Sequence, residues 1–84
     1  SVQGAELKPA DFNRFESIEV ISEGEKEIIL EFKGRDQKGL LMAAVAGLAK
    51  EGFDIRWAKI QTWGKRVEDI FCCLKKLDTT TRLD

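Results

Sequence analysis

The sequence predicts one small α+β domain, in which a four-stranded antiparallel sheet carries a helix on one face. Residues 27–33 alternate apolar and polar side chains, and residues 40–51 carry an apolar stripe with helical spacing. A second strand-like pair, from residue 53 to residue 75, is interrupted by a glycine-first turn. A chain of 84 residues is near the lower limit for a single core, so no second domain is expected.

Composition excludes several classes of function. The formal net charge is −1, from 14 basic and 15 acidic side chains, so a nucleic-acid partner is not expected. The longest apolar stretch, residues 39–49, is far shorter than the roughly 20 residues that span a membrane. No charged-then-apolar leader begins the chain, so a cytoplasmic location without membrane contact is expected.

Catalysis by this chain alone is not expected either. The chain has no histidine, which removes the commonest general base and metal ligand, and no catalytic residue, cofactor or metal site is predicted. Asp36 and Asp69, near strand ends, are interpreted as a cap or a solvated charge. Cys72 and Cys73 are adjacent in a strand, so they should face opposite sides of the sheet as buried, reduced thiols.

The first half of the chain predicts a hairpin that follows a short helix. Residues 1–8 have no period and are expected to be a flexible terminus, and the single domain should span residues 9–76. A short helix at residues 9–15 places Phe12 and Phe15 on one face, as core anchors. Residues 17–22 and 27–33 then form two strands, the second burying Ile28, Leu30 and Phe32.

The second half predicts a helix and a second hairpin. The helix at residues 40–51 is followed by Gly52 in a C-terminal cap position, and the cost of Gly47 inside a helix suggests a steric reason for it. Residues 53–63 read as one strand whose phase changes, which a bulge near Trp57 and Ala58 would reconcile. Gly64 and Lys65 form a two-residue turn into residues 66–75, and residues 77–84 are a frayed end or a truncated element.

The best candidate site is the polar turn between the second strand and the helix, residues 34–41. Asp36 has the short acceptor side chain of a helix N-cap, and Gly39 would lie in the first turn. Free backbone N–H groups at such a start attract a small anion, for example an amino-acid carboxylate, and Gly39 gives it clearance. An ordinary capped strand-to-helix connection is the alternative.

Basic and aromatic residues are interleaved in the second hairpin. Trp57 and Trp63 lie near four basic residues, a mixture that could stack on single-stranded nucleic acid. The basic residues are Arg56, Lys59, Lys65 and Arg66. Acidic residues alternate with them, which favours a solvated sheet face. The two tryptophans are candidates for a protein interface, with burial in the core as the alternative.

Two segments resemble a known family. Residues 28–41, Ile-Ile-Leu-Glu-Phe-Lys-Gly-Arg-Asp-Gln-Lys-Gly-Leu-Leu, resemble the first strand and ligand loop of ACT domains, small regulatory modules that bind amino acids. Asp36, Gly39, Leu40 and Leu41 match the Asp-x-x-Gly-Leu-Leu pattern of that family. Residues 58–71 are similar to the Ala-basic-Ile-x-Thr-x-Gly-x-Arg-Val-x-Asp-x-Phe run in the C-terminal ACT domains of the bifunctional uridylyltransferase/uridylyl-removing enzyme that modifies the PII protein.

The resemblance covers about residues 18 to 75 and implies a ferredoxin-like ACT sandwich. The family order is βαββαβ, but few residues follow residue 75. A permuted order, with strand 17–22 in the place of the last strand and the helix at 9–15 over the place of the second helix, would restore the sheet. In the alternative, the chain ends before those elements and a partner chain completes the edge. Lys38 stands where the family usually has proline.

The resemblance also implies a function. The chain would be a regulatory, non-catalytic domain of a larger nucleotidyltransferase in nitrogen regulation, would form a homodimer, and would bind an amino acid, by resemblance glutamine. The implied ligand-binding residues are Asp36, Gln37, Lys38, Gly39, Leu40 and Leu41. Two alternatives remain open: a dimerisation module of the same fold without ligand, and the ACT domain of a stringent-response synthetase that contacts RNA.

Overall fold

A computed structural model describes residues 9–76 of the chain. The segments at residues 1–8 and 77–84, for which a flexible and a frayed end were predicted, lie outside the described residues. The described elements are the 3₁₀ helix η2 (Ala10–Arg14), β1 (Ser17–Glu23), β2 (Glu27–Arg35), α1 (Leu40–Lys50), β3 (Phe53–Lys59), β4 (Thr62–Trp63) and β5 (Arg66–Lys75).

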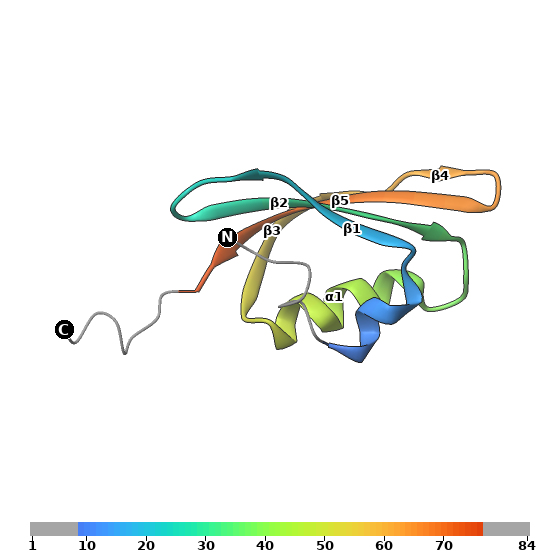
Figure 1. Ribbon diagram of the computed structural model, residues 1–84, viewed down its shortest axis with the longest axis horizontal. Helices are drawn as coiled ribbons and strands as arrows, with labels where there is room; N and C mark the ends of the chain where they lie inside the picture. Colours follow the sequence, from blue (N-terminus) through green and yellow to red (C-terminus); the bar gives the residue numbers. More distant parts are fainter. Residues whose placement is uncertain (1–8, 77–84) are drawn as a thin grey trace.

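The sheet confirms the predicted ferredoxin-like class. Its strand order is β1-β2-β5-β3, with the short β4 paired to β5, and every pairing is antiparallel. β1 lies at the edge beside β2, where the permuted order places it. Figure 1 shows α1 and η2 together on one face of the sheet, so the N-terminal helix lies where a second helix would otherwise cover the strands.

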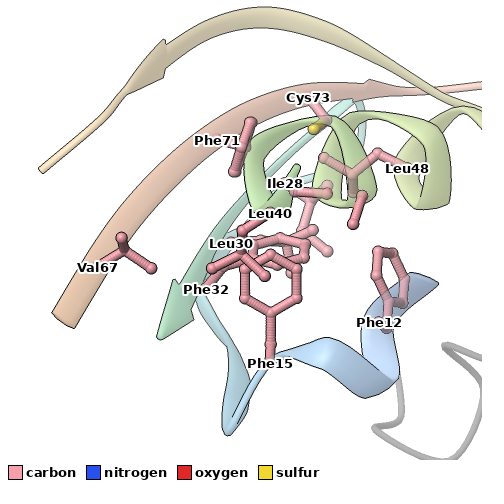
Figure 2. Packing of buried hydrophobic residues seen from close by; sticks show 12 residues of the cluster. Phe12, Phe15, Ile28, Leu30, Phe32, Leu40, Leu48, Val67, Phe71 and Cys73 are labelled. Carbon is pink, nitrogen blue, oxygen red and sulfur yellow. The ribbon is translucent and has the colours of Figure 1, made fainter. Parts of the chain in front are cut away.

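The core lies between that face and the two helices. In β2 the side chains of Ile28, Leu30 and Phe32 are fully buried, as the alternation predicts. Register places Leu30 opposite Phe71 and Ile28 opposite Cys73 on β5, so these side chains share the helix-facing side of the sheet. Figure 2 shows this cluster closed by Leu40 and Leu48 of α1 and by Phe12 and Phe15 from the N-terminal segment.

Aromatic rings attach the N-terminal segment to this core. The Phe32 ring meets Phe12, Phe15 and Phe71 edge to face, with centroids 5.4, 4.9 and 5.1 Å away. The predicted role of Phe12 and Phe15 as core anchors is therefore confirmed. A Cβ on Gly47 would lie 2.7 Å from Cδ1 and 2.9 Å from Cζ of Phe12, and this close approach explains a glycine inside α1.

The segment 53–63 is not one long strand, and this prediction was wrong. β3 ends at Lys59 and β4 begins at Thr62, because Gln61 donates its backbone N–H to the Asp69 carboxylate (3.1 Å), which interrupts the ladder. The predicted bulge is present one residue earlier, at Arg56, between Ile55 and Trp57. Gly64, with φ of +61°, opens the predicted two-residue turn from Trp63 to Arg66.

The two cysteines and the end of helix α1 have the predicted arrangement. Cys72 and Cys73 are free and buried on opposite faces of β5, and burial raises the pKa of the Cys73 thiol to about 11. The helix ends at Lys50, and Gly52 at φ +86° follows in the left-handed position of a C-terminal cap. Within residues 9–76, no helix is long and apolar enough to cross a membrane.

Candidate ligand site at the start of helix α1

Residues 36–39 connect β2 to α1 through a tight turn. The N–H of Leu40 donates to the carbonyl of Gln37 at 3.2 Å, and Gly39 has φ 79° and ψ 4°. Among the described residues only glycines have positive φ, so the φ of Lys38 is negative. A negative φ at Lys38 followed by a positive φ at Gly39 defines a type II turn. This turn requires a residue such as glycine at its third position and favours proline at its second, which Lys38 occupies.

The prediction that Asp36 caps the helix was wrong. The helix begins at Leu40, Gly39 is the N-cap residue, and no side chain caps it by a hydrogen bond. The turn lies between Asp36 and the helix, so the short carboxylate does not reach the amides of the first helical turn. Instead, the backbone N–H of Asp36 donates to the carbonyl of Lys65 at 2.7 Å, and its side chain remains exposed.

Arg14, at the end of η2, binds the same turn through its guanidinium group. Its Nη2 donates to the carbonyl oxygen of Lys38 at 2.7 Å and to Oε1 of Gln37 at 3.2 Å. Its Nη1 makes a longer contact, 3.5 Å, with the carbonyl of Gly39. Sequence analysis missed Arg14, because an exposed arginine on a short helix carries no signal for a contact 23 to 25 residues away.

Asp69 organises the hairpin beside the turn. The residue is only 2% exposed, so it is neither a helix cap nor a solvated charge, and that interpretation was wrong. Its Oδ1 accepts the Gln61 N–H, while the Gln61 carbonyl accepts the N–H of Glu68 at 2.9 Å. Burial, with a smaller contribution from the Asp36 charge, raises the pKa of the Asp69 carboxyl against the lowering effect of the Gln61 bond.

The structure brings five of the six predicted ligand-binding residues to the surface. Leu40 is the exception, because its side chain is 3% exposed and lies in the core, so only its backbone is near the turn. Leu41 and the neighbouring Met42 are 43% and 66% exposed. Within the described residues, the N–H groups of Leu41 and Met42 donate to no other group, as is usual in the first turn of a helix.

The second hairpin exposes both tryptophans. Trp57 is 49% and Trp63 60% exposed, so the alternative of burial in the core was wrong. Arg56 pairs with Glu27 at 2.7 Å and Arg66 pairs with Glu16, which supports the interpretation of a solvated, charge-paired face. Among residues 9–76, no group of three or more His, Cys, Asp or Glu side chains could hold a metal ion.

Fold and site define a small ferredoxin-like α+β domain with a glycine-dependent turn at the start of its helix. Part of the chain is similar to the bifunctional uridylyltransferase/uridylyl-removing enzymes of two Mycobacterium tuberculosis strains, CDC 1551 / Oshkosh and ATCC 25618 / H37Rv. Identity is 39% over 46 residues, which is 55% of this chain and 6% of each enzyme. No protein-family model matches the chain, and no solved structure matches it.

Proposed function

We propose that this chain is a regulatory ACT-type domain of a larger cytoplasmic nucleotidyltransferase in nitrogen regulation, and that it binds an amino acid, glutamine in the first instance. The domain itself is not catalytic, and it acts as a homodimer. The similarity to part of uridylyltransferase/uridylyl-removing enzymes supports the parent class. The observation that carries the binding proposal is the type II turn at Gly39, which opens directly onto the free amides of α1.

The turn suits an amino acid because it offers partners for both charged groups. The unpaired amides of Leu41 and Met42 and the positive end of the helix dipole favour a carboxylate. The exposed carboxylate of Asp36 is available to the ammonium group. Gly39 has no side chain between them, and Leu41 and Met42 provide apolar surface for the aliphatic part of the ligand.

Isothermal titration calorimetry with a panel of amino acids tests this proposal. We expect saturable heat with L-glutamine in the micromolar to millimolar range, lost in Gly39→Val, because a branched side chain at φ 79° strains the turn and fills the approach to the amides. The matched control is Gly52→Val, at φ 86°, which places the same strain at the other end of α1. Gly52→Val should retain binding.

Two results contradict the proposal. If no amino acid gives saturable heat with the folded wild-type protein up to millimolar concentration, the sensing role fails for this chain. If glutamine binds and Gly39→Val retains its affinity while Gly52→Val remains folded, the ligand lies elsewhere on the domain.

A dimerisation module without ligand is the second candidate. The exposure of Trp57 favours it, because this ring lies opposite Cys72 on the sheet face that carries no helix. Sedimentation equilibrium distinguishes the candidates. A dimer that Trp57→Glu dissociates, and that amino acids leave unchanged, supports a purely structural role. A dimer that tightens when glutamine is added supports sensing, since a ligand at an interface is linked to association.

A further inference from the structure

We propose that Arg14 is the positioning residue of the candidate site: it fixes the peptide groups of the turn and supplies a positive charge that selects for a carboxylate. The inference rests on the proposed function for its ligand, but its structural half can be measured in the ligand-free protein. It assigns a role in the site to the N-terminal segment, which lies outside both motifs that resemble ACT domains.

Arg14 orients the turn through its carbonyl groups. In a trans peptide the C=O and N–H bonds point to opposite sides. When Arg14 holds the Lys38 oxygen at 2.7 Å, the Gly39 N–H of the same peptide is therefore held facing away from the guanidinium. The longer contact between Arg14 and the Gly39 oxygen orients the next peptide in the same way. The Leu40 N–H of that peptide also points away from the guanidinium and donates to the Gln37 carbonyl, which closes the turn.

The position of Arg14 is itself fixed. It lies between the core anchors Phe12 and Phe15, whose side chains are 6% and 9% exposed. Directly after them, the Glu16 N–H donates to the Lys33 carbonyl at 2.8 Å and joins the segment to β2. The backbone that carries Arg14 is therefore held in place on both sides. The planar guanidinium has several donors in fixed directions and can bind three oxygens at once, whereas a lysine ammonium on its flexible side chain is less suited to this.

The charge of Arg14 also remains available. Within residues 9–76, no carboxylate lies within ion-pair distance of Arg14, whereas the other two arginines described above are paired with Glu27 and Glu16. Its hydrogen bonds go to neutral carbonyl and amide oxygens. An anion at the turn therefore meets a positive charge that no direct ion pair neutralises, in addition to the helix dipole. Asp11, whose charge interacts with Arg14 at longer range, is itself paired with Lys50 at 2.9 Å.

The test compares Arg14→Gln and Arg14→Lys with a charge-matched control, Arg56→Gln, on the remote sheet face. In the ligand-free protein, amide hydrogen exchange at residues 37–42 should be at least several-fold faster in both Arg14 variants and unchanged in the control. Binding of L-glutamine should weaken about tenfold in Arg14→Gln, less in Arg14→Lys, and within about twofold in Arg56→Gln.

A ligand without a carboxylate separates charge selection from loss of order. L-Glutaminamide has no carboxylate, so the preference for glutamine over glutaminamide should fall in Arg14→Gln and persist in Arg14→Lys. An unchanged preference in Arg14→Gln overturns the selective role, and unchanged exchange at residues 37–42 overturns the positioning role. If the wild-type protein binds neither compound, the proposed function and the selective role fail together, whereas the exchange data still decide the positioning role.

Discussion

Gly47 shows how one residue joins two parts of the chain. A glycine in a helix interior is about 1 kcal/mol less favourable than alanine, yet the Phe12 ring occupies the space of its missing side chain. The sequence indicates a steric reason for this glycine, but not its partner. The contact joins residues far apart in the chain, and no local pattern contains that information.

We predict that Gly47→Ala destabilises the domain by about 2 kcal/mol, because forcing a methyl group into the Phe12 ring costs more than the helix propensity gains. Chemical denaturation followed by circular dichroism measures the change. Combining Gly47→Ala with Phe12→Leu should reduce the additional loss, since the smaller side chain clears the space. A stabilised single variant would show that the ring does not pack as described.

Asp69 predicts an unusual pH dependence. Because burial raises its pKa above the ordinary value of 3.8, the folded state holds this proton more tightly than the unfolded chain does. As pH rises from about that ordinary value through the raised pKa, ionisation of Asp69 therefore lowers the free energy of unfolding. Asp11 and Glu16, whose pKa values are lowered by Lys50 and Arg66, act in the opposite direction.

The comparison of wild type with Asp69→Asn isolates this group, since asparagine keeps an oxygen for the Gln61 N–H and does not ionise. We expect the stability of Asp69→Asn relative to wild type to increase with pH in urea titrations from pH 3 to 7. Asp69→Leu should lose about 1–3 kcal/mol, because the Gln61 N–H loses its acceptor. A relative stability of Asp69→Asn that is constant with pH would contradict the raised pKa.

Among the helices and strands, those with a regular hydrophobic period were predicted from the sequence. The alternation at Ile28, Leu30 and Phe32 and the helical stripe after Leu40 correspond to β2 and α1. The interruption at Gln61 was missed, because it depends on a hydrogen bond to the buried Asp69 carboxylate. Asp36 was misassigned for a related reason: its spacing fits an N-cap, but a type II turn lies between it and the helix.

The turn between β2 and α1 gives two substitutions with opposite effects. Lys38 occupies the second position of a type II turn, so Lys38→Pro should stabilise the domain by about 0.4–1 kcal/mol through the unfolded chain. Gly39→Ala should destabilise it by about 1–2 kcal/mol, because φ is 79° there. Thermal denaturation of both variants checks the pair. Two changes of the same sign would argue against this turn type.

At the scale of the molecule, the N-terminal segment contributes both to the sheet and to the core. β1 fills the sheet edge beside β2, and η2 closes the core under the same strands. The hairpin pattern of residues 17–33 and the spacing of Phe12 and Phe15 made this arrangement predictable from the sequence. The contacts of Arg14 were not predictable, because they depend on where the N-terminal segment meets the turn.

Amide chemical-shift mapping of the wild-type domain titrated with L-glutamine tests most directly whether a ligand binds at the start of α1. We predict saturable shifts that are largest at Gly39, Leu41 and Met42, with little change at Gly24, in the turn between β1 and β2. Absence of saturable shifts up to millimolar glutamine, or shifts centred on the β1–β2 turn, would contradict a glutamine site at the start of α1.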